Sequence, residues 1–200
     1  LELAITGSGT LHGQQGTIRD NPVVTPLISG SFDNIDTLTG NGGVLIGNNV
    51  DTFWNITGAD SGTFGTSLAN IGDTTFNSFQ IIGGSADDTF VFQNGAGQIT
   101  GGIDGGLGTN TLTGSLGDDT FVISASTTVT VTPSGSGLAT TLTNITNIDG
   151  TNATDDGSTT VRDTGTDTFT INQDWGGSLN GAGGNDAFDF ADTRTVTGSI

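Results

Sequence analysis

The sequence predicts an all-β protein, and three features of its composition lead to that prediction. Turn-forming residues are abundant, with 35 Gly among 200 residues and Asn and Asp throughout the chain. Thr, Val, Ile and Phe, which favour extended strands, fill the segments between these turns. Helix-forming residues are scarce, because Lys and Met are absent and Glu occurs only at position 2. We therefore expect many short strands joined by tight turns.

The charge and the missing residue types exclude several classes of function. The net charge is -18, with 21 acidic residues against only three basic ones, Arg19, Arg162 and Arg194. Nucleic-acid binding through a basic surface is therefore excluded, since neutralising phosphates needs Lys or Arg. Without Cys or Lys the chain has no disulfide, zinc–thiolate, Schiff-base or Lys isopeptide chemistry. The single His12 lacks partners for catalysis and is expected to be a solvated residue. No apolar run reaches the roughly 18 residues of a membrane span.

Internal repeats carry most of the information. The tripeptide Asp-Thr-Phe occurs four times and is followed by one Asp-Ala-Phe variant; these copies begin at Asp51, Asp88, Asp119, Asp167 and Asp186. After each Phe the chain usually alternates, as in Phe90 and Phe92 or Phe121 and Ile123. Spacing by two places each such pair on one face of a strand. Phe53 departs from this pattern, because Asn55 stands where the second apolar residue is expected.

A second repeat is a nine-residue template with apolar residues at its first, fourth and seventh positions and Gly at its ninth. It begins at Phe32, Phe76 and Leu142. A spacing of three also occurs in helices, but each window is short, ends in Gly and contains poor helix formers. The repeat keeps its strands and varies its loops, as stacked solenoid units do. We therefore expect residues 1–200 to form a single β-solenoid domain or segment, with approximate repeats beginning near 32, 76 and 142.

The third pattern is a tandem pair of nonapeptides at residues 105–113 and 114–122, which fit Gly-Gly-x-Gly-x-Asp-x-apolar-x with Asn110 and Ser115 as departures. Degenerate copies lie at 83–91 and 181–189. Here the chain resembles the repeats-in-toxin (RTX) family and the large bacterial surface adhesins that carry diverged versions of it. The resemblance covers about a quarter of the chain. It implies a right-handed parallel β-helix, or β-solenoid, whose Gly-rich turns bind Ca²⁺ through Asp and carbonyl oxygens.

The resemblance implies Ca²⁺ as a cofactor, with ligands among the paired and isolated acids of these turns: Asp87, Asp88, Asp118, Asp119 and Asp186. The spacing departs from the family pattern. Ca²⁺-binding Asp residues lie two nonapeptides apart in the family, whereas Asp88 and Asp119 are 31 residues apart, and Asn110 carries no charge. The alternative is that the Gly, Asn and Asp residues shape the turns through hydrogen bonds. For Asp155–Asp156 a solvated loop is expected.

The function expected from these repeats is structural: a β-solenoid segment of a secreted bacterial surface adhesin or a self-assembling extracellular filament. Its partners would be copies of itself or adjoining solenoid segments stacked end to end, with a glycan or cell-surface ligand as an adhesion target. The chain starts at Leu1 without a signal segment, so we expect a processed product or a piece of a longer polypeptide. No convergent catalytic site is visible, and no catalytic or organic-cofactor-binding residue is predicted.

Three other interpretations remain open. The first is a β-helix carbohydrate-active enzyme, a polysaccharide lyase, hydrolase or epimerase, that uses paired Asp for acid–base chemistry and Trp54 and Trp175 for sugar stacking. Large residues closing a core column are the competing explanation for both Trp residues. Ice binding by a Thr ladder is disfavoured because the Thr-x-Thr pairs do not recur at a fixed length. The Asn-x-Thr sequons carry little weight in so Asn- and Thr-rich a chain.

Overall fold

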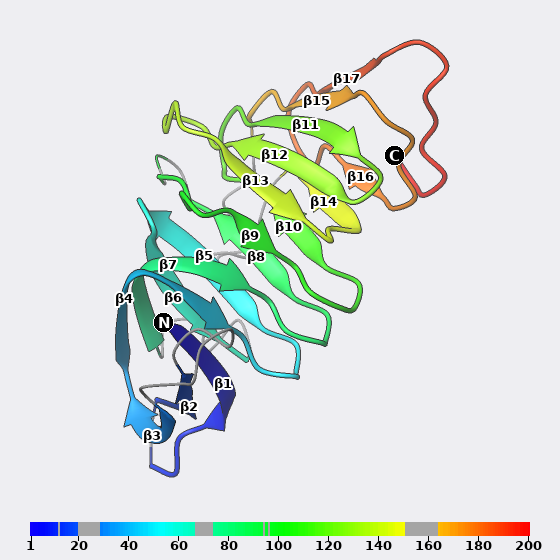
Figure 1. The fold of residues 1–200 in the computed structure, drawn as a ribbon. Coiled ribbons are helices and arrows are strands. Elements are labelled where there is room, and N and C mark those ends of the chain that lie inside the picture. Colours follow the sequence, from blue (N-terminus) through cyan, green and yellow to red (C-terminus); the bar gives the residue numbers. More distant parts are fainter. Residues whose placement is uncertain (12, 20–28, 67–73, 94, 96, 151–163) are drawn as a thin grey trace.

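The computed structural model describes residues 1–11, 13–19, 29–66, 74–93, 95, 97–150 and 164–200 (Figure 1). All regular elements within these ranges are β-strands, which confirms the predicted all-β class. The strands belong to one large mixed sheet that is mostly parallel, since ten of the sixteen strand pairings are parallel. Within the described ranges no helix is long and apolar enough to cross a membrane.

The strands are short and follow one another closely along the chain. In order they are β1 (Glu2–Ser8), β2 (Gln14–Arg19), β3 (Ser29–Ile35), β4 (Thr37–Ile46), β5 (Phe53–Gly58), β6 (Ser61–Gly65), β7 (Thr74–Ile82), β8 (Thr89–Phe92), β9 (Ile103–Asp104), β10 (Thr111–Thr113), β11 (Thr120–Ala125), β12 (Thr128–Thr132), β13 (Thr140–Thr143), β14 (Asn147–Asp149), β15 (Thr168–Ile171), β16 (Leu179–Asn180) and β17 (Ala187–Phe190).

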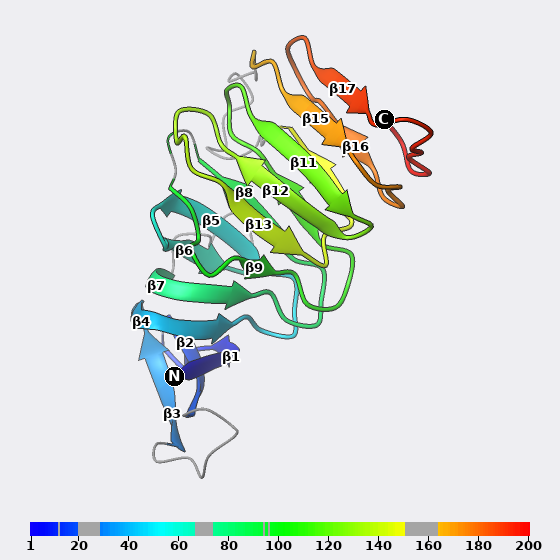
Figure 2. The ribbon, with the colours of Figure 1, turned by 45° about the horizontal axis from the view of Figure 1, so that its top comes forward.

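The hydrogen-bonded pairings arrange these strands in two rows. Row A runs β3–β2–β1–β4–β7–β9–β13–β12–β11–β15–β17 and uses the second halves of β4 and β7. Row B starts from the first halves of β4 and β7 and continues through β6–β5–β8–β10–β14–β16. Figures 1 and 2 show most of row A lying in front of row B, so that the chain passes repeatedly from one row to the other.

Antiparallel strands enter at three places, where the chain folds back on itself before crossing to the other row. The groups β1–β2–β3 and β11–β12–β13 lie in row A, and β5–β6–β7 lies in row B. Each group ends in one of the nine-residue templates. The third template position has positive φ in every copy: 58° at Asn34, 62° at Ser78 and 56° at Asn144. The template therefore encodes strand, left-handed corner, strand, and this corner carries the chain across.

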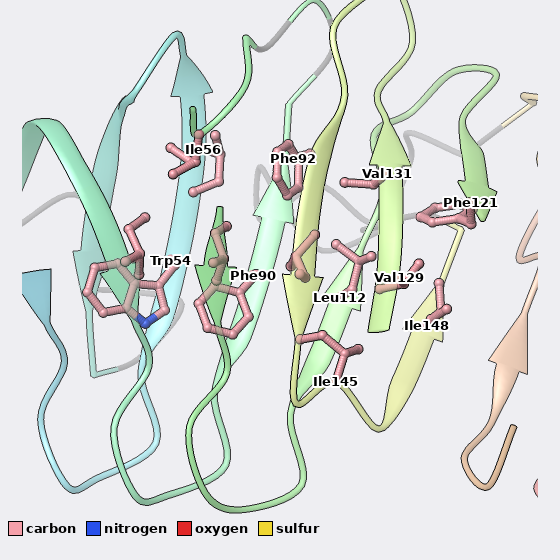
Figure 3. Packing of buried hydrophobic residues seen from close by; sticks show 14 of the residues in the cluster. Trp54, Ile56, Phe90, Phe92, Leu112, Phe121, Val129, Val131, Ile145 and Ile148 are labelled. Atoms are coloured by element: carbon pink, nitrogen blue, oxygen red, sulfur yellow. The ribbon is translucent and has the colours of Figure 1, made fainter. Parts of the chain in front are cut away.

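The apolar core fills the space between the rows (Figure 3). In row B five residues from successive strands are register neighbours, each at most 1% exposed: Trp54, Phe90, Leu112, Ile148 and Leu179. In row A the matching column is Leu45, Ile81, Ile103, Leu142 and Val129. Each strand thus adds one buried apolar residue to a column shared with its neighbours. The burial of apolar area grows with strand number.

An aromatic stack continues the core of row A into its last strands. Phe121 and Phe169 lie 4.8 Å apart between ring centroids with 19° between ring planes, and Phe169 and Phe188 lie 4.7 Å apart at 11°. The predicted inward pairs are confirmed for β8, β11 and β15, where the Phe and the apolar residue two positions later are buried. In β17 the pattern weakens, because Phe190 is 39% exposed.

The first Asp-Thr-Phe copy is aligned differently from the others. Trp54 and Ile56, not Phe53, are the inward pair of β5, and both are fully buried. Trp54 is the register partner of Phe90, so the equivalent of Asp88 is Thr52 and not Asp51. Aligning the tripeptides by sequence is therefore wrong by one residue at this copy, and the shift explains why Asn55 interrupts the expected alternation.

Candidate functional site

Six of the connections between the two rows begin with Gly and end at equivalent positions, and they form two stacks of turns. Residues 47–52, 83–88 and 105–110 lead from row A to row B and form the first turn stack. Residues 114–119 and 181–186 lead from row B to row A and form the second turn stack, together with Gly150 and residues 164–167, the described ends of the connection from β14 to β15. Every turn begins with Gly, and its last residue is, in order, Thr52, Asp88, Asn110, Asp119, Asp167 or Asp186. Five of the six turns therefore end in Asp or Asn.

Side chains at the last turn position link each turn to the preceding one in its stack. In the first stack the Thr52 amide donates to Oδ1 of Asp88 at 3.0 Å, and the Asp88 amide donates to Oδ1 of Asn110 at 2.9 Å. In the second stack the Asp119 amide donates to Asp167 at 2.8 Å, and the Asp167 amide to Asp186 at 3.0 Å. Each ladder joins residues that are 19 to 48 positions apart in sequence.

The residue before each ladder position makes the opposite connection. Asp87 accepts a hydrogen bond from the Thr109 amide at 2.7 Å, and Asp118 accepts one from the Thr166 amide at 2.8 Å. Asp51 accepts a longer one, of 3.3 Å, from the Asp87 amide. These outer carboxylates are exposed and hold the next turn, whereas the inner side chains are mostly buried and hold the previous one. The pair Asp87 and Asp88 thus ties its turn to both neighbours in the stack. In the pair Asp118 and Asp119 the outer acid holds the next turn, and the inner acid accepts from Ser115 and Ser134.

The glycine at the start of a turn makes room for the acid at its end. A Cβ atom at Gly114 would lie 2.5 Å from Oδ2 of Asp119 and closer still to the Gly150 carbonyl oxygen. A Cβ atom at Gly83 would overlap Oδ2 of Asp88 and lie 2.5 Å from the Gly105 carbonyl oxygen. No side chain fits in either place. The first Gly and the last Asx of a turn are therefore one structural unit, and the need for Gly here is space and not backbone conformation.

Burial differs among the five acids predicted as calcium ligands. Asp88 and Asp119 are each 1% exposed, whereas Asp87 and Asp118 are exposed. Asp119 is supplied with three donors, the amide and hydroxyl of Ser115 and the amide of Ser134. The amide and the side chain of Thr52 both hydrogen-bond the Asp88 carboxylate, whose Oδ2 has no hydrogen-bond partner among the described residues. Burial raises the pKa of Asp88 to about 7, and the nearby carboxylates of Asp51 and Asp87 add to that rise.

The donor set of these turns does not fit a calcium ion, which takes six to eight oxygen ligands. Nowhere in the described parts of the chain do three or more acidic or His side chains gather as a metal cluster would require. Each of the five predicted acids already uses a carboxylate oxygen to accept a backbone amide. We therefore assign none of them as a ligand. Calcium binding by the chain stays a prediction, and Asp155–Asp156 and His12 lie outside the described residues.

Asn110 illustrates why the ladder residues change along a stack. Its Oδ1 accepts the Asp88 amide, while its Nδ2 donates to the carbonyl oxygens of Asn144 at 3.0 Å and Leu107 at 3.2 Å. Next to the Nδ2 atom of Asn110 lies the left-handed corner at Asn144, whose carbonyl oxygen accepts a hydrogen bond from that atom. An amide meets both demands, because it accepts with one atom and donates with the other. The Asn that departs from the nonapeptide pattern is thus explained by its neighbour.

Two described features bear on the interpretation as a carbohydrate-active enzyme, the two Trp residues and a pocket near Asp60. Trp54 and Trp175 are 0% and 1% exposed, so both close core columns instead of forming a sugar-stacking platform. One pocket of about 300 Å³ is lined by Gly42, Asp60, Ser78, Phe79, Gln80, Thr100 and Gly101. Its one carboxylate, Asp60, accepts hydrogen bonds from the amide and hydroxyl of Thr100. The pocket therefore lacks the second carboxyl group that paired acid–base chemistry needs.

The sequence repeats locate these turns but do not show the partners of their acids. In the sequence Asp167 is distinguished only by its place in a repeat, yet it is fully buried and links Asp119 to Asp186. The missing signal was the Gly at the start of each turn, and Gly150 with Asp167 is hidden by the long intervening segment. Comparison of the chain with protein-family models, with curated proteins and with solved structures found no match.

Proposed function

We propose that the chain is a segment of a right-handed parallel β-helix, or β-solenoid, with a structural role in a secreted bacterial surface adhesin or a self-assembling extracellular filament. The two rows of strands, joined by stacked turns, support this architecture. Connections between parallel strands of one sheet are right-handed in nearly all proteins. The resemblance of residues 105–122 to RTX repeats supports the extracellular bacterial setting.

The observation that carries the structural role is how the acidic side chains are used. The described turn acids bind backbone amides of neighbouring turns, and the inner ones are buried. An enzyme of this architecture needs carboxyl groups that face a substrate in a groove. Here the same groups hold successive turns together over the length of the chain. Such cross-links favour a rigid spacer, whose partners would be copies of itself or adjoining segments stacked end to end.

Imaging of the purified chain tests this proposal. Electron microscopy in buffer with Ca²⁺ should show rods or filaments whose cross-section matches the two rows of strands. The same sample in chelator separates two versions of the proposal: rods that loosen support calcium locking, and rods that persist support turns held by hydrogen bonds alone. Compact isolated particles in both buffers, at every protein concentration, would contradict the self-assembling version.

The alternative function is a β-helix enzyme acting on polysaccharides, and it needs its own assay. Incubation with acidic and neutral polysaccharides, followed by chromatography of the products, measures cleavage directly. Cleavage that disappears in Asp60→Asn would move the function to the pocket between β4, β7 and the turn at Asp60. The structural proposal predicts that no polysaccharide is cleaved. The protein sample used in this assay can then be imaged by electron microscopy.

A further inference from the structure

Oδ2 of Asp88 is a buried carboxylate oxygen that has no hydrogen-bond partner among the described residues. Asp88 and Asn110 are the last residues of adjacent turns in the first turn stack. Oδ1 of Asp88 accepts the Thr52 amide, and Oδ1 of Asn110 accepts the Asp88 amide. The two side chains also place their second polar atom alike. Nδ2 of Asn110 lies 2.7 Å from the Cβ position of Gly105, and Oδ2 of Asp88 lies against the Cβ position of Gly83.

The surroundings of that second atom are alike as well. Beside Nδ2 of Asn110 is the carbonyl oxygen of Asn144, which accepts its hydrogen bond at 3.0 Å. The carbonyl oxygen of Gly105 takes the corresponding place near Asp88, because it and Oδ2 of Asp88 both lie against the Cβ position of Gly83, the carbonyl oxygen at 2.5 Å. Asn110 thus presents a donor to a carbonyl oxygen, whereas an ionised Asp88 would present a second acceptor. Two buried acceptors facing one another repel and leave both unsatisfied.

Charge around Asp88 adds to this conflict. The carboxylates of Asp51, in the turn below, and Asp87, in its own turn, raise the cost of a further negative charge. In the turn above, Asp104 precedes Gly105 and accepts hydrogen bonds from the Gly106 amide and from Asn144. The chain has no Lys, and none of its three Arg residues lies in these turns. The equivalent positions on either side, Thr52 and Asn110, are neutral.

We infer that Asp88 is a neutral carboxylic acid in the folded protein, and that its Oδ2–H donates to the Gly105 carbonyl as the Asn110 amide donates to Asn144. One proton then fulfils the role that the RTX resemblance gives to a calcium ion, joining consecutive turns at a Gly–Asp pair. The inference does not depend on the proposed function, since it concerns how one turn is closed. The first turn stack should therefore be most stable at acidic pH.

The sign of the pH effect follows from the raised pKa of Asp88, about 7 when folded against 3.8 as the ordinary value. Below about pH 4 the group is protonated in both states, and its stabilising contribution is complete. As the pH rises from about 4 to 7, the unfolded chain releases the proton while the folded chain retains it, so stability falls. Above pH 7 the folded chain must bury a charge or open the turn.

Two variants isolate this effect. Asp88→Asn keeps the shape and supplies a permanent donor, and Asp87→Asn removes one charge at the adjacent exposed position. In denaturant unfolding at pH 4, Asp88→Asn should match the wild type; at pH 8 its folded-to-unfolded ratio should be about ten- to a hundredfold higher. Asp87→Asn should keep the fall in stability with rising pH but make it smaller, because it removes one of the charges that raise the pKa of Asp88. The difference at pH 8 should be the same in Ca²⁺ and in chelator.

Several results would overturn the inference. If the Asp88→Asn variant is less stable than the wild type at pH 8, the folded protein needs an ionised Asp88. Stabilisation of the wild type by Ca²⁺ that disappears in Asp88→Asn would make Asp88 a ligand. The ¹³C chemical shift of the Asp88 carboxyl carbon, followed by NMR in the wild type, is independent of any substitution. It should titrate near pH 7, and a titration near pH 4 would contradict the neutral acid.

Discussion

The backbone amide of Asp119 donates a 2.8 Å hydrogen bond to Oδ1 of Asp167, a residue 48 positions further along the chain. Both residues end a turn between the rows of strands, and Asp167 in turn donates its own amide to Asp186. The Phe residues two positions after each Asp stack on one another in the same order. A polar ladder and an aromatic column therefore run side by side, and the carboxylate of Asp119 at the start of the ladder holds Ser115 and Ser134.

Removing the Asp119 carboxylate should destabilise the fold strongly. Asp119→Ala leaves the amides of Ser115 and Ser134 and the Ser115 hydroxyl without their acceptor in a buried site. The free energy of unfolding should fall by about 3 kcal/mol or more. Asp118→Ala is the control, since its carboxylate is exposed and accepts one amide, and it should cost about 1 kcal/mol. Denaturant unfolding measures both, and equal losses would contradict the structural role of the buried Asp119 carboxylate.

Gly114 should not tolerate a side chain. The Cβ atom of Gly114→Ala would collide with the Gly150 carbonyl and lie 2.5 Å from Oδ2 of Asp119, so the second turn stack must spread apart. We expect a loss of about 2 to 4 kcal/mol in unfolding free energy. Gly176→Ala provides the comparison, because open space surrounds its Cβ position. That variant should unfold within about 0.5 kcal/mol of the wild type.

The aromatic column should contribute more at its middle than at its edge. Phe169 is fully buried between Phe121 and Phe188, so Phe169→Ala removes two stacking contacts and leaves a cavity. Its expected cost is about 3 to 5 kcal/mol. Phe190→Ala alters the same sheet row at a residue that is 39% exposed and should cost less than about 2 kcal/mol. Thermal unfolding that ranks the two variants in the reverse order would refute this account of the core.

The left-handed corner in the nine-residue template can be tested at Ser78. Its φ of 62° is unfavourable for a β-branched residue, so Ser78→Val should lose about 1 to 2 kcal/mol and Ser78→Gly should gain up to about 1 kcal/mol. Gln80→Val, on the same strand at an ordinary φ, controls for the change of side chain and should have little effect. Similar losses for Val at both positions would show that the corner is not the cause.

The sequence by itself determined the local structure of this protein. Residues that prefer extended backbone, separated by Gly, Asn and Asp, were sufficient to predict strands and turns, because those preferences act over a few neighbouring residues. The inward pairs Phe90 with Phe92 and Phe121 with Ile123 followed from spacing alone and are buried as predicted. The nine-residue template also marks three of the places where the chain crosses between the rows, although the sequence alone does not show that its third residue is left-handed.

Only the tertiary structure decided what each acid does. Whether Asp87 or Asp88 points inward depends on strand register, and a shift of one residue exchanges the two faces. The same rule explains why Thr52, and not Asp51, is the equivalent of Asp88. The Ser134 amide that donates to Asp119 is 15 residues away, and the Asp167 carboxylate that accepts the Asp119 amide is 48 residues away. The Gly105 carbonyl oxygen that lies near Asp88 belongs to the next turn of the stack. Sequence spacing could therefore locate the acids, but only packing between distant turns determines which of them are buried and what they bind.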